Sequence, residues 1–312
     1  MRVLILNINK VSVVIPVYNR ANTIVKSINS VLSQTGDFLI EILVVDDYSD
    51  DRDLLLSNLS AISEGMDDSR FDLKVILHEE NRHGGAARNS GVKQSTGDVI
   101  AFLDSDDVWV EDKLESCCKV LSENSYDFVY HQLTYNNSNV IIPARRVNDG
   151  ESYMDYLICS NGSMQTSTLV FKKDIFTRID FSEDLKKYQD FDLIYKCEKS
   201  GLRVGFIPRV MTIMDNNPNS VRISNSFDPD KSIYWMNKVG DGISSKAKNT
   251  FIMARIVKYY CLSGDKITGL KFAIHNVSFD RSLFSCYKYF SFILCPLVII
   301  NCVKKVKNFF LR

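Results

Sequence analysis

The sequence has no pair of cysteines with the spacing of a metal or redox motif. Its eight cysteines include no Cys-x-x-Cys, and the only adjacent pair is Cys117-Cys118. This pattern is typical neither of a zinc framework nor of the disulfide scaffold of a small secreted domain, and it favours a reducing cytoplasm. A Gly-x-Gly-x-x-Gly turn is also missing after the first apolar run, which argues against a dinucleotide-dependent oxidoreductase.

The chain also lacks an excess of charge and a long hydrophobic run. Its 38 basic and 38 acidic residues cancel, so we expect no nucleic-acid partner. An uncharged stretch at 290–303 has fourteen residues and contains Pro296, and it is short of the roughly 20 residues of a membrane span. No small-residue cleavage site follows the apolar N-terminus, and we therefore expect no secretion signal.

What is present is an alternation of apolar strands and amphipathic helices. Short apolar runs rich in β-branched residues predict strands at 11–19, 40–47, 73–80 and 98–104, the first two of them buried, with helices following the first three. Such alternation predicts an α/β fold with a mostly parallel sheet flanked by helices. In this class of sheet, ligands bind beyond the carboxyl ends of the strands. We therefore expect the functional site at that edge.

Beyond residue 125 the pattern is looser. We expect an edge strand at 126–137, a strand leading into a helix at 166–176, a helix at 188–201 and a strand at 203–214. The expected helix has Phe191, Ile194, Tyr195 and Glu198 on one stripe and ends at Gly201. From residue 226 onward the sequence is largely helical.

Three carboxylates follow the fourth predicted strand. Asp104 and Asp106 are two residues apart, so an extended segment would project both carboxylates to the same side. Two oxygens aimed the same way suit a hard divalent cation such as Mn²⁺ or Mg²⁺. The alternative is that Asp106 or Asp107 caps the helix that carries Lys113. The local residues alone do not decide between the two.

Two further groups lie at the same edge of the predicted sheet. Asp46 and Asp47 end the second strand and need donors, such as a base N–H or a ribose hydroxyl. Taken by themselves, these acids are better explained by a turn with a helix cap at Asp50 or Asp51. Gly84 and Gly85 precede a helix start, where close backbone approach and free N–H groups favour a diphosphate.

These motifs resemble a family 2 glycosyltransferase of the GT-A fold. The resemblance is carried by "VSVVIPVYNR", "ILVVDDYSDD", "NRHGGAARNSGVKQSTGDVIAFLDSDD" and, more loosely, "YQDFDL". It is close over 11–115, moderate to about 215 and absent beyond. Because four motifs occur in the right order, the resemblance is specific.

The resemblance implies a nucleotide-sugar donor, usually a UDP-sugar, and a divalent metal on its diphosphate. It places Asp104 and Asp106 as metal ligands, with Asp106 the more direct one, and it has Asp46 or Asp47 accept from the uracil. The positions that it implies for nucleotide-sugar binding are Pro16, Val17, Tyr18, Asn19, Asp46, Asp47, Gly84, Gly85, Arg88, Asp104 and Ser105.

Inversion at the anomeric carbon requires a base for the acceptor hydroxyl. The family places an aspartate at the start of a helix some way past the metal motif, and Asp190 occupies that place. Asp192 is the second candidate, and we expect it to face solvent. By local sequence alone, Asp190 is better explained as a helix-start residue that interacts favourably with the helix dipole, and it is the resemblance that favours the base.

Three positions depart from the family pattern. Gln189 stands where a glutamate usually precedes the base, and Tyr48 stands where the turn after the acidic pair usually has a small residue. A histidine common in relatives is replaced by "MDNNPNSVRIS", in which Asn216, Asn217 or Asn219 are the possible substitutes. The identity of the donor sugar is therefore not transferable.

We expect residues 1–225 to form the glycosyltransferase domain, with a nucleotide-sugar-binding half at 1–115 and an acceptor half at 116–225. Residues 226–312 form a helical C-terminal region. Within it, segment 284–312 either packs on the domain or lies at a membrane interface, with its basic residues near anionic headgroups. We favour the second interpretation, which makes the protein cytoplasmic and peripheral at the inner face of the membrane.

The resemblance implies an inverting enzyme, and we expect it to extend a lipid-linked saccharide acceptor in surface polysaccharide assembly, where many members of the family work. Transfer onto a polyprenyl phosphate is the nearest alternative, since such enzymes share the front half of the chain. A nucleotidyltransferase is disfavoured because "IPVYNRANT" has no glycine. A non-catalytic nucleotide-sugar-binding scaffold would have lost acidic residues that this chain retains.

Overall fold

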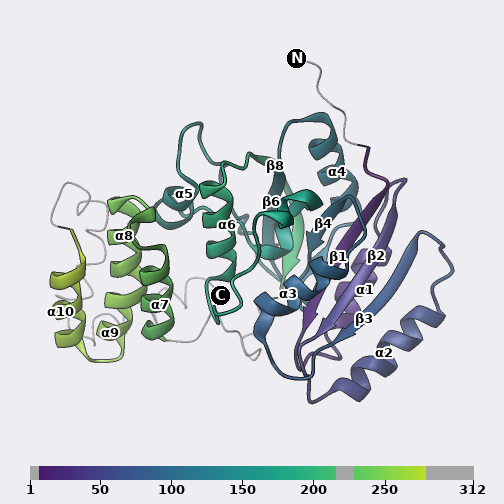
Figure 1. Cartoon of the computed structure of the whole chain (residues 1–312), viewed down its shortest axis with the longest axis horizontal. Helices are drawn as coiled ribbons and strands as arrows, with labels where there is room; N and C mark the ends of the chain where they lie inside the picture. Colours follow the sequence, from purple (N-terminus) through teal and green to yellow (C-terminus); the bar gives the residue numbers. More distant parts are fainter. Residues whose placement is uncertain (1–6, 216–227, 279–312) are drawn as a thin grey trace. The chain divides into compact units, whose positions relative to one another are not determined.

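The computed structural model describes residues 7–215 and 228–278, which belong to two compact units (Figure 1). The first unit comprises Met1–Asn148 and Gly162–Ser220, and the second comprises Asp149–Asn161 and Val221–Arg312. The stretch 149–161 thus belongs with the C-terminal helices, which the sequence pattern does not indicate.

The first unit is built on one eight-stranded sheet of order β3-β2-β1-β4-β7-β6-β8-β5. Strands β1 to β4 pair in parallel, β7 is antiparallel to β4 and β6, and β5 is antiparallel to β8. The strands are β1 (Lys10–Val17), β2 (Leu39–Asp46), β3 (Phe71–Leu77), β4 (Val99–Phe102), β5 (Val108–Trp109), β6 (Phe128–Tyr135), β7 (Val170–Lys172) and β8 (Val204–Met214). The expected α/β fold is confirmed.

Helices cover both faces of this sheet (Figure 1). Ile28, Leu55 and Leu114 share one core cluster with alternate residues of β1 and β2. On the other face, Gly91 lies so close to Val14 that a Cβ atom there would collide with it. The helical elements are α1 (Ile24–Leu32), α2 (Arg52–Glu64), α3 (His83–Gln94), α4 (Lys113–Glu123), η1 (Thr166–Thr168), η2 (Lys173–Thr177) and α6 (Gln189–Lys199). Burial on both faces explains why the first strands are almost continuously apolar.

One expectation for the second half of the unit is wrong. Strand β6 is not an edge strand, because it pairs with β7 on one side and β8 on the other. The expected helix is present as α6, which buries Asp192, Leu193, Ile194 and Cys197, so that only Ile194 of the expected stripe is buried. Gly201 follows α6 with φ +65°, as a helix C-terminus requires.

A carboxylate in the middle of β2 anchors the connection from α3 to β4. Glu41 is fully buried. It accepts hydrogen bonds from the Ser12 hydroxyl (2.5 Å), the Thr96 hydroxyl (2.9 Å) and the Gly97 N–H (3.0 Å). Lys10 Nζ lies 3.3 Å from the same carboxylate. The alternation of strands and helices along the chain does not indicate that Glu41 is a buried acid.

The second unit is helical, as expected from residue 226 onward. Its elements are α5 (Tyr153–Cys159), α7 (Pro229–Val239), η4 (Gly240–Gly242), α8 (Ser245–Phe251), the π-helical turn η5 (Ile252–Val257), α9 (Lys258–Leu262) and α10 (Lys266–Asn276). Trp235 is fully buried and packs on Phe251, with ring centroids 4.9 Å apart. Side-chain caps at Ser152, Asp228 and Ser244 start α5, α7 and α8.

Among the helices of residues 7–215 and 228–278, none has the length and apolar character needed to cross a bilayer. The segment 284–312, for which we expect a membrane interface, lies outside the described residues, as do Asn216, Asn217 and Asn219.

Candidate active site

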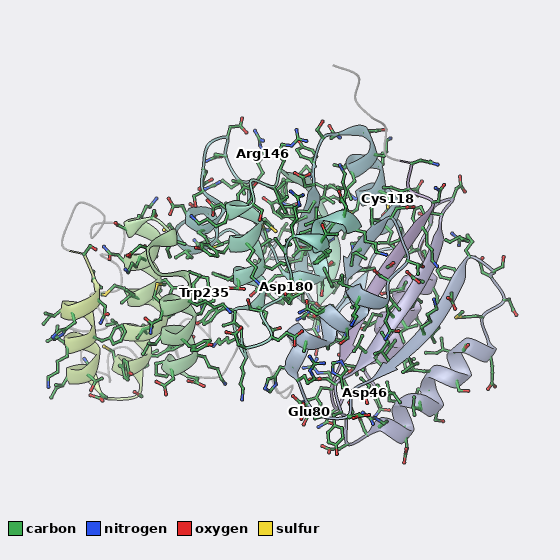
Figure 2. The ribbon with its side chains drawn as sticks, in the orientation of Figure 1. Asp46, Glu80, Cys118, Arg146, Asp180 and Trp235 are labelled. Carbon is green, nitrogen blue, oxygen red and sulfur yellow. The ribbon has the colours of Figure 1, made fainter. Side chains whose placement is uncertain are left out.

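The strand order places a topological switch point between β1 and β4. The chain leaves β1 toward α1 and leaves β4 toward β5, so the residues after the two strands are neighbours at the carboxyl edge. We call this part of the edge the crevice. The residues that follow β2 and β3 lie along the same edge, where Figure 2 labels Asp46 at the end of β2. The edge that we predicted for the site is therefore the edge at which the candidate residues gather.

Asp104 is held by an arginine from a different element. Arg88 of α3 donates from Nη2 to Asp104 (2.5 Å) and from Nη1 to the side-chain oxygen of Gln189 (2.9 Å). Gln189 is the first residue of α6 and precedes Asp190, the candidate base. The Arg88 guanidinium thus joins the metal motif to the start of the helix that carries the base.

Asp106 is paired with a second arginine. Arg20, which follows β1, forms an ion pair with Asp106 across the switch point. Neither Asp106 nor Asp107 caps the helix that carries Lys113, because α4 begins at Lys113 with Asp112 at its N-cap position. The capping alternative is wrong for both residues.

The metal-motif loop is fixed by Ser167 of η1, which the sequence did not single out. The Ser167 hydroxyl donates to the buried Asp107 (2.6 Å) and accepts from the Asp104 N–H (3.1 Å). Its carbonyl oxygen accepts from Trp109 Nε1 (2.8 Å) and from the Thr212 hydroxyl (3.1 Å). Ser167 is about 60 residues away in the chain from this loop, so no local spacing could have identified it.

Asp190 lies partly exposed in the first turn of α6. Desolvation raises the pKa of its carboxyl and the nearby Asp104 adds to the rise, while the Phe191 N–H (2.9 Å) and the Arg88 guanidinium oppose it. A carboxylate with a raised pKa is a stronger base. Because Asp190 accepts from the Phe191 N–H, it also interacts with the N-terminus of α6, as the helix-start explanation predicts.

Asp192 does not face solvent, so that expectation is wrong. Its side chain is 1% exposed and accepts from the Ser182 hydroxyl (2.6 Å). Lys196 Nζ lies 3.6 Å from the same carboxylate. These contacts tie α6 to the segment before it, which is a structural role.

Asp46 and Asp47 both have partners within the chain. Asp46 is fully buried and accepts from Arg52 Nε (2.5 Å) and the Ser49 N–H (3.1 Å). Asp47 accepts from the Arg82 N–H (2.9 Å) and lies 2.8 Å from His78 Nδ1. The sequence motifs did not pair Arg52 with Asp46, which lies six residues earlier at the end of the same strand, nor His78 with Asp47, which follows a different strand. That either aspartate accepts from uracil stays a prediction.

The expected pocket after β1 is only partly supplied by side chains. Val17 is 2% exposed and packs in the core, so only its backbone can face the crevice. Tyr18 is 46% exposed, and Pro16 is partly buried. The Asn19 side chain is joined to Asp50 by two hydrogen bonds, of 2.9 Å and 2.7 Å. Of these residues, Tyr18 is the side chain best placed to contact a ligand.

Strained backbone gathers at this edge. The non-glycine residues Asn19, Tyr48, His83 and Tyr188 have φ between 53° and 68°, and such strain is often stored at functional sites. Tyr48, one of the departures from the family pattern, is 51% exposed, and the Arg52 guanidinium lies 5.5 Å from its ring centroid.

Gly84 and Gly85 have neighbours from their own chain. A Cβ atom on Gly84 would lie 3.1 Å from Arg88 Nη1, and one on Gly85 would lie 3.1 Å from the Ser182 carbonyl oxygen and 3.3 Å from Gln189 Nε2. Close packing of α6 and the segment before it therefore explains both glycines without a ligand. The expected diphosphate contact at this helix start stays a prediction.

The residues present fit a hard divalent cation that brings further ligands with it. Residues 7–215 and 228–278 contain no group of three or more His, Cys, Asp or Glu that could hold a metal. The Asp104 and Asp106 side chains are 34% and 14% exposed. They lie in a turn, in which the Asp107 N–H donates to the Asp104 carbonyl oxygen (3.1 Å), and not in the extended segment that we expected. They offer two carboxylates at the crevice, with Ser105 between them. Mg²⁺ is commonly bound through one or two carboxylates and substrate phosphates.

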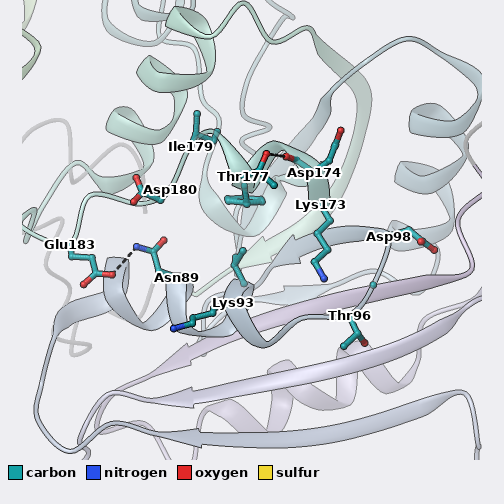
Figure 3. Close-up of a pocket in the computed structure, with 13 residues that line it drawn as sticks. Asn89, Lys93, Thr96, Asp98, Lys173, Asp174, Thr177, Ile179, Asp180 and Glu183 are labelled. Atoms are coloured by element: carbon teal, nitrogen blue, oxygen red, sulfur yellow. Dashed lines mark hydrogen bonds between the residues drawn. The ribbon is translucent and has the colours of Figure 1, made fainter.

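A separate pocket of about 790 Å³ lies beside α3 and η2 (Figure 3). Lys93 and Lys173 line it together with Asp174, and Asn89 donates to Glu183 at its rim (3.0 Å). None of the predicted site residues is among the described residues that line it. We assign it no part in the site.

A model of glycosyl transferase family 2 matches residues 12–176, more than half of the chain. The chain belongs to this family. The glycosyltransferase resembles the amylovoran biosynthesis glycosyltransferase AmsB of Erwinia amylovora, with 27% identity over 284 residues that cover 88% of this chain and 90% of AmsB. Family membership and such relatives make it an enzyme of the glycosyltransferase class, as predicted.

Two further proteins are similar to parts of this glycosyltransferase. The Escherichia coli UDP-Glc:alpha-D-GlcNAc-diphosphoundecaprenol beta-1,3-glucosyltransferase WfgD is 37% identical over 132 residues, which cover 42% of this chain and 49% of WfgD. The crystal structure of S. aureus TarS 1-349 aligns with a TM-score of 0.56 and 19% identity, covering 86% of this chain and 89% of that one. TarS 1-349 has also been solved in complex with UDP and with UDP-GlcNAc. The likeness to TarS shows the GT-A fold.

Proposed function

We propose that this glycosyltransferase moves a sugar from a UDP-sugar donor to a saccharide hydroxyl, with inversion at the anomeric carbon. The observation that carries the proposal is the meeting of three elements at one edge. Asp104 follows β4, Arg88 lies on α3, and Gln189 and Asp190 start α6. A UDP donor is supported by the name of WfgD and by the UDP complexes of TarS.

Asp104 and Asp106 would hold Mn²⁺ or Mg²⁺ at the donor diphosphate. When bound, the cation supplies Lewis-acid stabilisation of the departing nucleoside diphosphate. The two guanidinium groups beside these carboxylates, Arg20 and Arg88, carry fixed positive charge at the same place. Planar guanidinium groups suit phosphate oxygens as well as carboxylates.

Asp190 would take the proton of the acceptor hydroxyl as that oxygen attacks the anomeric carbon. Its raised pKa supports this role, because a more basic carboxylate accepts a proton more readily. Gln189, held by Arg88, fixes the start of α6 relative to Asp104. This contact would hold the base, Asp190, in a constant position relative to the leaving group near Asp104.

The acceptor that we propose is a lipid-linked saccharide in surface polysaccharide assembly. The names of AmsB and WfgD support this, one through amylovoran biosynthesis and the other through a diphosphoundecaprenol acceptor. Peripheral membrane contact fits such an acceptor. On α10 the side chains of Ile267, Leu270 and Ile274 are 71%, 44% and 55% exposed, and the helix carries Lys266 and Lys271 but no acidic residue, which suits an anionic lipid surface.

The test is release of UDP from a panel of UDP-sugars by the full chain with Mn²⁺, with and without undecaprenyl-diphosphate saccharides as acceptors. We expect one donor to release UDP at a rate that rises strongly with a saccharide acceptor. A rate that rises with undecaprenyl phosphate alone would favour transfer to polyprenyl phosphate. Absence of UDP release with every donor and acceptor would contradict the proposal.

The membrane part is tested separately by sedimentation with vesicles that contain anionic lipid. We expect Ile267→Ser with Ile274→Ser to lower the bound fraction, while Thr268→Ser on the same helix leaves it unchanged. Equal binding of the wild type, the double variant and Thr268→Ser would show that α10 does not contact the membrane.

A further inference from the structure

Both carboxylates of the metal motif are engaged by arginines. Arg88 pairs with Asp104, and Arg20 pairs with Asp106. Each of these guanidinium groups offsets the charge of the carboxylate that it contacts. The two carboxylates therefore attract a divalent cation less strongly, and a cation that binds there must displace a guanidinium or lie beside it.

The two arginines differ in how they are held. Arg88 lies on α3 with its side chain 10% exposed, and it is also bonded to Gln189. Arg20 lies in the turn after β1 with its side chain 25% exposed. The backbone around Arg20 is fixed, because its carbonyl accepts from the Thr23 and Ile24 N–H groups at 3.1 Å each. Movement of Arg20 is thus a matter of its side chain alone.

We propose that Arg20 exchanges Asp106 for the donor diphosphate, so that nucleotide binding frees Asp106 for the divalent cation. The inference rests on the proposed function and deepens it by naming a residue that couples the two ligands. The diphosphate offers Arg20 anionic oxygen acceptors in place of the Asp106 carboxylate, and a planar guanidinium suits both kinds of acceptor. The anion also brings negative charge that attracts the cation.

This exchange makes the binding of nucleotide and metal mutually dependent. If UDP raises the affinity for Mn²⁺, then Mn²⁺ must raise the affinity for UDP by the same factor. In the absence of UDP, Arg20 competes with the cation for Asp106. Removal of the Arg20 charge therefore has opposite effects on the two ligands, because it improves binding of Mn²⁺ alone and weakens binding of UDP.

The test is a titration of the full chain with Mn²⁺, followed by the electron paramagnetic resonance signal of the free ion, with and without UDP. For the wild type, we expect UDP to raise the Mn²⁺ affinity by about tenfold or more. For Arg20→Gln, we expect the affinity for Mn²⁺ alone to rise about fivefold and the effect of UDP to fall below about threefold. Arg20→Lys keeps the charge but not the planar fork, and should lie between the two proteins.

Arg203→Gln is the matched control. The Arg203 side chain is 62% exposed and lies 3.9 Å from Asp127, away from the crevice, so we expect wild-type values. Coupling in Arg20→Gln equal to that of the wild type, or weaker Mn²⁺ binding without UDP, would overturn the inference and leave the proposed function intact. A wild type that binds neither UDP nor any other nucleoside diphosphate with Mn²⁺ would overturn both.

Discussion

Arg88 and Asp104, sixteen residues apart in the chain, form an ion pair of 2.5 Å between α3 and the loop after β4. The same guanidinium reaches Gln189, 101 residues further along, at 2.9 Å. One side chain therefore sets the distance between the metal motif and the candidate base. The resemblance to the family leads us to expect a glutamate at position 189, and here the neutral glutamine accepts a hydrogen bond from Arg88.

Replacement of Arg88 should remove the hydrogen bonds that join Asp104 to Gln189 at the start of α6. We expect Arg88→Lys to lower kcat by about 100-fold, because an ammonium group cannot bond Asp104 and Gln189 together as the planar guanidinium does. Steady-state kinetics with the best donor measure this. Lys93→Gln, an exposed change on the same helix, serves as control, and a kcat for Arg88→Lys within twofold of the wild type would contradict the role.

Asp190→Asn should remove the base while donor binding persists. We expect kcat to fall by about 10² to 10⁴-fold, with little change in the affinity for UDP. Calorimetry with UDP gives the control measurement. A loss of UDP binding equal to the loss of rate would instead show that Asp190 holds the donor or the fold.

The pH dependence of kcat carries a second signature of Asp190. The raised pKa predicts that activity is lost as pH falls through a value above the ordinary 3.8 of an aspartate, since only the deprotonated form accepts the hydroxyl proton. The residual activity of Asp190→Asn should lack this acid limb. An unchanged acid limb in the variant would assign it to another group.

Ser167→Ala should make the loop of Asp104 and Asp106 less ordered, although it changes neither of these two residues. The hydroxyl holds both the Asp107 carboxylate and the Asp104 N–H, so we expect about a tenfold loss of Mn²⁺-dependent UDP affinity. Binding of UDP without metal should change less. Thr168→Ser, a neighbouring buried change, should leave both unaffected, and equal losses with and without Mn²⁺ would point to a general packing defect.

Glu41 should make the first unit sensitive to acid. Burial alone would raise the pKa of this carboxyl, but hydrogen bonds from Ser12 and Thr96 and the charge of Lys10 together lower it from 4.5 to about 2. Because the folded-state pKa is depressed, the contribution is complete above about pH 4.5 and is lost as pH falls toward 2. By linkage it is on the order of 3 kcal/mol at neutral pH.

Thermal unfolding of wild type and Glu41→Gln from pH 7 to pH 3 tests this point. We expect the variant to unfold at a lower temperature at pH 7 and the difference to narrow toward pH 3. Glu64→Gln, at the end of α2, is the control. A difference that stays constant with pH would mean that the charge of Glu41 is not what stabilises the unit.

The sequence predicted the front half of the fold because β1, β2 and β4 are almost entirely buried, whereas β3 lies at the edge of the sheet and is largely exposed. Apolar runs such as 11–17 and 40–45 leave no other interpretation, and the polar residues that end them mark the edge of the sheet. Strand β6 was misplaced because it carries His131 and Gln132, polar residues that suggest an edge. Its position between β7 and β8 follows from pairings that no local pattern encodes.

Sequence motifs pointed to candidate residues that lie within one short segment, such as Asp104, Asp106 and Asp190. They did not point to Arg20 and Ser167, which contact the metal motif from other elements. The solvent-facing position expected for Asp192 was wrong because the segment before α6 folds back and covers it through Ser182. Such contacts depend on tertiary packing, and spacing along the chain carries no record of them.

The central claim is tested most directly by calorimetry of UDP binding with and without Mn²⁺, on the wild type and on Asp106→Ala. We predict that the wild type binds UDP with an affinity that depends on Mn²⁺, and that this dependence disappears in the variant. Metal-independent binding of UDP that is equal in both proteins, or no binding in the wild type, would contradict the account.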